Sequence, residues 1–425
     1  MTPKSHQEII DSLLEKMTTT EKVALLSGRN KWYTVPIDRL GIPSIVMTDG
    51  PHGVRTEGHG SDRIVSTATA YPTGISMAST WNRDLIERVG VGLAEETRHL
   101  GCNILLGPCV NIVRSPLGGR NFETFAEDPH LAGQIGVAYV NGVQSQQIGV
   151  SLKHYAANNQ EIERFRGNSV VDERTLREIY LPAFETVVKV AHPWTVMCSY
   201  NRINGTYASE HEILLRKILK EEWGFEGVVV SDWGAVHDIF DPIEAGLDLE
   251  MPGPAKYFGQ ALEAAVNNWQ VDERWVDDAV RRMLKMLLRS GAITEETLPL
   301  GSGDTPAHRG LARELANESM VLLKNDNDLL PLDSAQIRKL AVIGLNANAE
   351  VSGGGSSRVD PHYWVTPLEG LRAKFGNQIE ILYEPGYDNR VIPKTVEKER
   401  FTHTDGTTQG LKTELFSNLE LMGEP

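Results

Sequence analysis

Short apolar runs alternate with stretches of helical periodicity between about residue 40 and residue 290. The runs are rich in Val, Ile and Leu and lack a polar face, which is typical of strands buried on both sides of a sheet. The stretches between them place apolar residues at helical spacing opposite a charged face. This alternation predicts a parallel sheet wrapped by helices.

Polar residues follow the predicted strands one after another, on the carboxyl side each time. This layout is typical of a (β/α) barrel, whereas an open doubly wound sheet would gather them at one switch point. The predicted strands cover residues 42–48, 104–106, 149–152, 195–197, 228–230 and 247–251, and the main helices cover 9–17, 20–26, 84–100, 131–146, 172–190, 210–222, 239–245 and 272–290. Six strands are fewer than the eight of a full barrel, so an incomplete TIM-type barrel stays open.

A second α/β unit follows the barrel. Residues 291–309 are rich in Gly, Pro, Thr and Ser, which predicts a linker. Helices are then expected at 310–324 and 368–375, and strands at 340–343 and 379–383. Two strands do not make a stable sheet alone, so we expect this chain to be a piece of a longer protein.

Composition narrows the classes of partner. Lys and Arg number 42 against 57 Asp and Glu, and the net charge of −15 argues against nucleic acid or an anionic membrane as partner. The three cysteines show no metal-ligand spacing and are expected to be reduced core thiols. The N-terminus lacks the apolar core of a signal peptide, and no apolar run approaches a membrane span. A cytoplasmic location is expected, although removal of a signal peptide would leave the same pattern, so secretion stays open.

The stretch 227–238, GVVVSDWGAVHD, is the strongest candidate for chemistry. A buried strand ends here in Asp232, Trp233 and Gly234, which suits an active site at the carboxyl end of a barrel strand. The alternative is that Asp232 only caps a helix at 235–239.

Other strand ends supply a set of polar residues that should converge with Asp232 if the barrel prediction is right. Carboxylates accept hydrogen bonds from vicinal hydroxyls, Arg and Lys donate to the same oxygens, and an indole offers an apolar face to a sugar ring. A carboxylate below an anomeric carbon can act as a nucleophile. The set therefore favours a neutral polyhydroxylated ligand, and it comprises Asp49, Arg120, Lys153, His154, Arg164, Tyr200, Asp232 and Trp233.

The sequence gives little support for a metal, serine-hydrolase or nucleotide site. The chain has no H-E-x-x-H zinc motif, no G-x-S-x-G elbow and no nucleotide-binding glycine motif, and its cations would repel a metal ion. Each candidate also has a structural alternative. Lys153 and His154 could form a solvated strand end, and Arg120 could pair with Glu123 or Glu127 to fold its own loop. Glu161 is expected to be a partner of Lys153 or of an Arg rather than a catalytic acid.

Six stretches follow one another along the chain: MTDGPHGVR (47–55), GRNFETFAEDP (119–129), LKHYAANNQE (152–161), VMCSYNRING (196–205), VVVSDWGAVHD (228–238) and LLKNDNDLLPL (322–332). In this order they resemble glycoside hydrolase family 3, and most closely its β-glucosidases. SDWG alone would be a weak signal, but this many motifs in the right order are highly specific.

The resemblance implies a retaining, exo-acting β-glucosidase with Asp232 as nucleophile. Trp233 matches a wall of the sugar pocket. The remaining matches to positions that hold the sugar at the non-reducing end are Asp49, Arg120, Lys153, His154 and Tyr200, with Arg164 and Met197 less closely placed. It implies no cofactor and no metal, β-glucosides or oligosaccharides as partners, and a homo-oligomer is compatible with it. A β-xylosidase is the nearest alternative within the family.

The acid/base is the one element that the resemblance does not place. The K-H-F-P-G-H-G loop of the N-acetylglucosaminidase branch is absent, and in the β-glucosidase branch the acid/base is a Glu of the second, α/β sandwich domain. No residue of this chain is assigned to that role. The resemblance implies a barrel over 1–290, a linker over 291–309, the start of the sandwich over 310–395 and the start of a PA14-like insert over 396–425. A sugar-binding fragment that is inactive for lack of its acid is therefore the second hypothesis.

Overall fold

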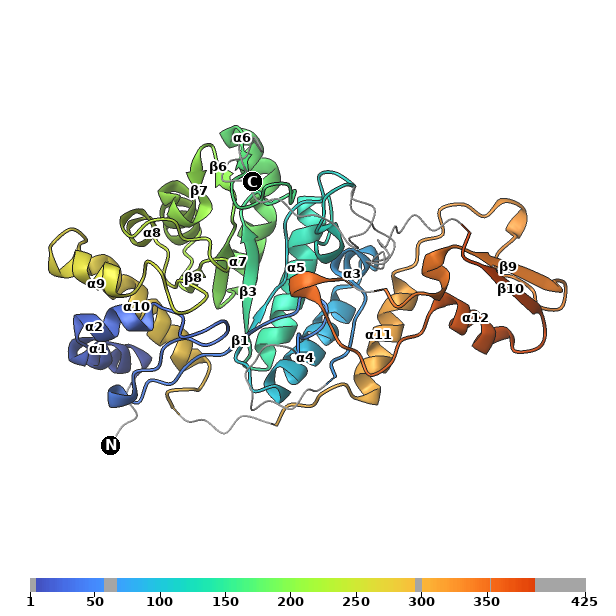
Figure 1. The fold of residues 1–425 in the computed structure, drawn as a ribbon, viewed down its shortest axis with the longest axis horizontal. Helices are drawn as coiled ribbons and strands as arrows, with labels where there is room; N and C mark the ends of the chain where they lie inside the picture. Colours follow the sequence, from blue (N-terminus) through green and yellow to red (C-terminus); the bar gives the residue numbers. More distant parts are fainter. Residues whose placement is uncertain (1–4, 57–66, 295–299, 352, 387–425) are drawn as a thin grey trace, which may run out of the picture. The chain divides into compact units, whose positions relative to one another are not determined.

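The computed structural model describes residues 5–56, 67–294, 300–351 and 353–386 (Figure 1). The chain divides into two compact units. Unit 1 comprises Met1–Asp328 and Val351–Trp364, and unit 2 comprises Leu329–Glu350 and Val365–Pro425. The region 396–425, expected to begin a PA14-like insert, lies outside the described residues. Across the described part of the chain, no helix combines the length and the apolar character needed to cross a bilayer.

The centre of unit 1 is a parallel sheet with the strand order β1-β2-β3-β5-β8. The strands are β1 (Met47–Asp49), β2 (Ile104–Leu106), β3 (Gly149–Tyr155), β5 (Thr195–Cys198) and β8 (Val228–Val230). All of their residues are buried, as expected for apolar runs without a polar face. The prediction of a parallel sheet is confirmed.

Single β-bridges carry the sheet from β8 back to β1. In order around the ring, they pair Val230 with Leu249 and Glu250 with Ser27 in parallel, then Gly28 with Thr34 and Tyr33 with Val46 antiparallel. The sheet thus closes into a barrel in which an N-terminal hairpin stands where a full barrel has further βα units. The strand predicted at 247–251 is reduced to these bridges. The strand predicted at 42–48 begins only at Met47, because Ile42 pairs with Ile37 instead.

Amphipathic helices cover the outside of the barrel, and α4, α5 and α7 pack side by side there (Figure 1). The helices of this unit are α1 (His6–Lys16), α2 (Thr19–Leu25), α3 (Gly74–Ser79), α4 (Arg83–His99), α5 (Pro129–Ser145), α6 (Glu173–Thr175), α7 (Pro182–Ala191), α8 (Phe240–Ala245), α9 (Gln260–Asn267), α10 (Glu273–Arg289) and α11 (Pro306–Glu318). The short helices α3 and α9 were not predicted.

The helix predicted at 172–190 is interrupted. Asp172 caps it as expected, accepting from the Thr175 amide, but a π-helical turn at Leu176–Tyr180 separates α6 from α7. Pro182 has no N–H to continue the α-helical ladder, and the Leu181 amide donates to the Leu176 carbonyl five residues back. Ile213–Glu222, predicted as part of a helix, is also π-helical.

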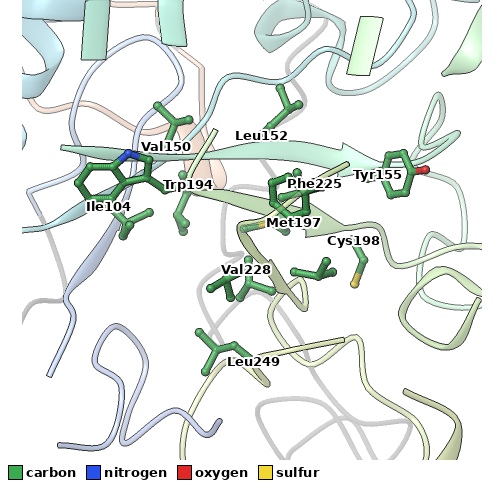
Figure 2. Close-up of a cluster of buried hydrophobic side chains, with 14 of the residues drawn as sticks. Ile104, Val150, Leu152, Tyr155, Trp194, Met197, Cys198, Phe225, Val228 and Leu249 are labelled. Atoms are coloured by element: carbon green, nitrogen blue, oxygen red, sulfur yellow. The ribbon is translucent and has the colours of Figure 1, made fainter. Parts of the chain in front are cut away.

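Apolar side chains from neighbouring strands interlock in the core. Figure 2 shows Val150, Leu152, Met197 and Val228 among them. Burying such a side chain stabilises the fold by about 1.5–3 kcal/mol. Because packing on both faces of the sheet fixes the strands, the backbone of the residues that follow each strand is also held in place.

Unit 1 extends beyond the expected boundary at residue 290. Helix α11 begins at Pro306, inside the predicted linker, and lies against α4, where Arg88 pairs with Glu314 at 2.7 Å. His308 of α11 contacts Glu95 and Glu96 of α4, each at 2.9 Å. These contacts attach α11 to the barrel. Unit 2 contains a parallel pair, β9 (Lys339–Ile343) and β10 (Glu380–Glu384), with α12 (Pro367–Phe375).

Candidate active site

A cavity of about 180 Å³ lies at the carboxyl ends of the barrel strands. All nine residues predicted to form the site line it: Asp49, Arg120, Lys153, His154, Arg164, Met197, Tyr200, Asp232 and Trp233. Lys31, Trp32, Arg55 and Ser356 complete the lining.

The parallel strands explain why these residues meet. Asp49 is the last residue of β1, Lys153 and His154 lie near the end of β3, and Asp232 follows β8 after a single residue. The carboxyl ends of parallel barrel strands share one rim, so residues more than a hundred positions apart come together.

Asp232 presents a free carboxylate oxygen to the cavity. Its Oδ1 accepts from the Trp233 amide at 2.8 Å, while its Oδ2 lies 3.8 Å from His154 Nε2 and has no hydrogen-bond partner among the described residues. Burial raises the pKa of Asp232, and the charges of Arg120 and Lys153 oppose that shift. A basic carboxylate with one unpartnered oxygen has the chemistry of a nucleophile.

The interpretation of Asp232 as a helix cap is wrong. The next helix, α8, begins only at Phe240, whose amide donates to Asp238 Oδ1 at 2.7 Å. Gly234 lies between, with a φ of 85° that turns the chain away from helical geometry. Asp232 therefore has no helix to cap.

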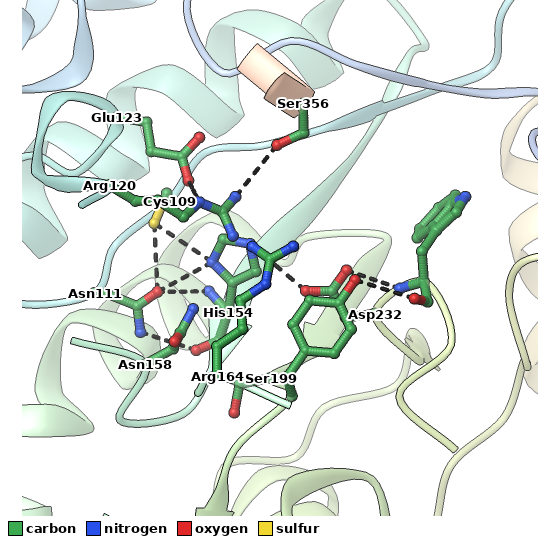
Figure 3. Close-up of polar contacts among 12 residues, drawn as sticks. Cys109, Asn111, Arg120, Glu123, His154, Asn158, Arg164, Ser199, Asp232 and Ser356 are labelled. Atoms are coloured by element: carbon green, nitrogen blue, oxygen red, sulfur yellow. Dashed lines mark hydrogen bonds and ion pairs between the residues drawn. The ribbon is translucent and has the colours of Figure 1, made fainter. Parts of the chain in front are cut away.

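His154 is held as a neutral imidazole. Burial lowers its pKa well below the usual range, and the charges of Arg120, Lys153 and Arg164 lower it further. Asn111 fixes the residue, because its Nδ2 donates to the His154 carbonyl at 2.9 Å and its Oδ1 accepts from the His154 amide at 2.9 Å (Figure 3).

The same Asn111 Oδ1 lies 3.2 Å from ring Nδ1 of His154. Since this oxygen can only accept, Nδ1 carries the proton and Nε2 faces the cavity as an acceptor. His154 is consequently suited to binding a hydroxyl and unsuited to acting as an acid at neutral pH. The role of Asn111 was missed, although NIVR follows the second predicted strand in the sequence.

Asp49 and Lys153 form a second charged group on the rim. Asp49 Oδ2 lies 3.3 Å from Arg55 Nη1. Burial raises the pKa of Asp49, against the charges of Lys153 and Arg55. Lys153 is only 1% exposed and His154 2%, so the interpretation of a solvated strand end is wrong. A buried carboxylate can accept hydrogen bonds from adjacent hydroxyls, and the two cations beside it can donate to the oxygens of the same hydroxyls.

Arg120 lines the cavity and also pairs with Glu123. It can therefore serve both as a site residue and as an ion-pair partner within its own loop. Arg120 Nε lies 2.5 Å from Glu123 Oε1, and Arg120 Nη2 lies 3.5 Å from Ser356 Oγ (Figure 3). Ser357 donates to the other oxygen of Glu123. Glu123 and the two serines were not predicted for the site.

Aromatic side chains form one wall. The rings of Trp32 and Trp233 lie 5.7 Å apart, and Trp233 Nε1 donates to the Lys31 carbonyl at 2.7 Å. The Tyr200 hydroxyl donates to the Trp233 carbonyl at 3.1 Å. Arg164 lies over the Tyr200 ring. These contacts hold flat apolar surfaces at the cavity edge, as a sugar ring requires.

Glu161 behaves as expected, because its Oε2 pairs with Arg164 Nη1 at 3.0 Å. Cys109, Glu123 and His154 bring possible metal-ligand atoms within 4.8 Å of one another. This group fits a metal poorly. The Arg120 guanidinium already pairs with Glu123, and burial raises the pKa of the Cys109 thiol to about 12, so the thiol stays protonated.

Two protein-family models match the chain. The model of the Glycosyl hydrolase family 3 N terminal domain matches residues 12–286, and that of the Glycosyl hydrolase family 3 C-terminal domain matches residues 320–414. The first match spans the barrel and every residue of the cavity except Ser356.

Named relatives agree with these models. A beta-glucosidase from Rhizobium radiobacter is 49% identical over 383 residues, covering 90% of this chain and 46% of that protein. Thermostable beta-glucosidase B from Acetivibrio thermocellus is 44% identical, covering 89% and 50%. The structure of DesR, a beta-glucosidase from Streptomyces venezuelae in complex with D-glucose, matches with a TM-score of 0.83 at 36% identity, covering 91% of this chain and 50% of that one.

The chain spans about half the length of the curated relatives it matches. The family resemblance of its motifs and the TIM-type barrel are confirmed. Since the first family model alone matches well over half of the sequence, the chain belongs to glycosyl hydrolase family 3.

Proposed function

We propose that the protein is a retaining, exo-acting β-glycosidase that removes terminal β-D-glucosyl residues from the non-reducing end of its substrates. The observation that carries this proposal is the unpartnered, buried Asp232 Oδ2, in a cavity lined with hydroxyl-binding side chains. The names of the relatives, beta-glucosidases, support glucose as the sugar.

Two displacements at the anomeric carbon would complete the reaction. In the first, Asp232 Oδ2 forms a bond to this carbon while the bond to the aglycone oxygen breaks, giving a glycosyl ester. In the second, a water oxygen attacks the same carbon and releases a proton to solvent, the ester bond breaks, and Asp232 recovers its carboxylate. Arg120 and Lys153 favour the ionised carboxylate that both steps require.

The leaving aglycone needs a proton, and no carboxyl group of the described cavity lining stands free to donate it. Its carboxyl groups are Asp49, which pairs with Arg55, and Asp232 itself. His154 is neutral because its pKa lies well below the usual range. This observation favours a second candidate function, a sugar-binding chain that cleaves only substrates with good leaving groups.

The two candidates differ in their dependence on the leaving group. A dinitrophenyl glucoside departs without protonation, whereas cellobiose needs an acid, whose contribution is typically about 10²–10⁴-fold. Cleavage of both substrates at rates within about tenfold of each other would favour the complete enzyme. Cleavage of the dinitrophenyl glucoside alone would favour the second candidate.

Replacement of the nucleophile tests the proposed mechanism. Asp232→Asn keeps the shape of the side chain and should lower the hydrolysis of dinitrophenyl β-D-glucoside at least about a thousandfold. Asp241→Asn, on an exposed residue outside the cavity, is the matched control and should keep normal activity. Near-normal activity of Asp232→Asn would overturn the assignment. A cytoplasmic location and a homo-oligomeric state stay predictions.

A further inference from the structure

One segment of unit 1 comes from a distant part of the sequence. Residues 351–364 belong to this unit, although they lie in the chain between two stretches of unit 2. We call residues 353–360 the strap.

The strap is packed closely against the barrel loops. A Cβ atom at Gly353 would lie 2.5 Å from the Phe122 ring, and Val359 is buried in the core. The Ala68 amide donates to the Asp360 carbonyl at 3.0 Å. The strap is therefore fixed at both ends.

A chain of polar contacts leads from the strap to the cavity. The Ser357 hydroxyl donates to Glu123 Oε2, and Glu123 Oε1 lies 2.5 Å from Arg120 Nε. Ser357 and Glu123 are each 1% exposed, whereas the Arg120 guanidinium reaches the cavity (Figure 3). Neither buried residue lines the cavity, so neither can touch a ligand there directly.

Glu123, Ser357 and Arg120 have different roles in this chain of contacts. Glu123 uses one oxygen to hold Arg120 Nε, which leaves the terminal guanidinium nitrogens for other partners. Ser357 occupies the other oxygen and so limits rotation of the carboxylate. A free arginine side chain loses rotamer entropy when a ligand fixes it, and a guanidinium already fixed loses less.

We infer that Glu123 and Ser357 are positioning residues, which fix Arg120 for the sugar so that docking of the strap completes the sugar site. The inference rests on the proposed function for the identity of the ligand. It adds that the strap, which lies more than two hundred residues beyond Arg120 in the sequence, fixes the Arg120 guanidinium before the sugar binds.

The first test needs no sugar. Phenylglyoxal labels arginine after the guanidinium loses a proton, and the contact with Glu123 raises the pKa of Arg120 against the effect of burial. Peptide mapping should show labelling of Arg120 several-fold faster in Glu123→Gln and in Ser357→Ala than in the unaltered chain. Labelling of the exposed Arg174 serves as the internal reference. Equal Arg120 labelling rates in all three proteins would overturn the inference.

The second test measures the sugar site with dinitrophenyl β-D-glucoside. Both variants should raise KM on the order of tenfold, as expected for loss of a charge-assisted contact, and change kcat much less. Two matched controls, Glu163→Gln and Ser79→Ala, alter exposed residues outside the cavity and should leave both constants unchanged. A purely structural role would instead lower kcat in proportion to the fraction of unfolded protein, with an unchanged KM.

The two tests separate this inference from the proposed function. If the unaltered protein neither cleaves nor binds the glucoside, the proposed function fails, and the labelling rates still decide whether the strap positions Arg120. If the unaltered protein is active and the variants match the controls in both tests, the inference alone fails.

Discussion

A buried ion pair contacts β8, the strand that precedes Asp232. Lys220 Nζ lies 2.7 Å from Asp248 Oδ1, with side chains 4% and 1% exposed. The other oxygen, Asp248 Oδ2, accepts from the Val229 amide of β8 at 2.7 Å. Asp248→Asn removes the charge while keeping an acceptor for this amide, so the variant isolates the loss of the ion pair.

The cost of this change can be worked from the contacts. Removing one partner of a buried pair costs about 3–5 kcal/mol, because the remaining charge stays buried without compensation. Burial lowers the pKa of Lys220, which agrees with a strongly desolvated ammonium. Asp278 lies 3.6 Å from the same ammonium and would retain part of the compensation. We therefore expect the lower end, a loss of about 3 kcal/mol in the free energy of unfolding.

Urea unfolding at neutral pH, followed by tryptophan fluorescence, measures this loss. Glu221→Gln is the matched control, because its exposed pair with Lys217 at 3.2 Å should contribute less than about 1 kcal/mol. If Asp248→Asn and the control lose the same small amount, the reasoning about the buried pair is refuted. A double replacement, Lys220→Met with Asp248→Asn, should recover part of the loss, since no unpaired charge remains buried.

Three further predictions concern His308 on α11, the cavity wall at Trp233, and Asn111 beside His154. Burial opposes protonation of His308, but hydrogen bonds to Glu96 and Glu95 outweigh it and raise the pKa of His308. Its stabilisation should be complete below about pH 6.5, the usual pKa of histidine, and should be lost as the pH rises through the raised value. The difference in melting temperature between the unaltered chain and His308→Gln should therefore shrink from pH 6 to pH 9, and a constant difference would contradict this linkage. Trp233→Ala removes the apolar wall and should raise the KM for dinitrophenyl β-D-glucoside on the order of tenfold, and an unchanged KM would exclude ring stacking. Asn111→Ala leaves the buried amide and carbonyl of His154 without their partner and should cost about 2–4 kcal/mol in urea unfolding, whereas a loss below about 1 kcal/mol would show that other groups replace the amide.

The sequence could predict those site residues that lie at the ends of strands. Asp49, Lys153 and Asp232 sit at or just after buried apolar runs, and the rule that parallel strands share one rim brought them together without coordinates. Periodicity likewise located most helices to within a few residues, because their buried faces are uninterrupted.

The sequence could not predict which segments, far apart along the chain, contact one another at the cavity. Trp32 enters the cavity from an N-terminal hairpin that replaces missing barrel units, and no local pattern distinguishes that hairpin from a loop. Ser356 and Ser357 reach Arg120 and Glu123 from more than two hundred residues away. The glycines at 353–355 indicate a close approach of the backbone to another segment, but they do not indicate which segment. Pro182 could have predicted the break between α6 and α7, since proline removes a helical donor.

The most direct test of the central claim is identification of the residue that bonds to the sugar. Incubation with a 2-deoxy-2-fluoro-β-glucoside that bears a dinitrophenyl leaving group needs no acid to form the covalent adduct, and the fluorine slows its hydrolysis. Intact mass and peptide mapping should then show one sugar on the peptide that contains Asp232. An adduct on another carboxylate, or no adduct in a folded sample that binds glucose, would contradict the assignment of Asp232 as nucleophile.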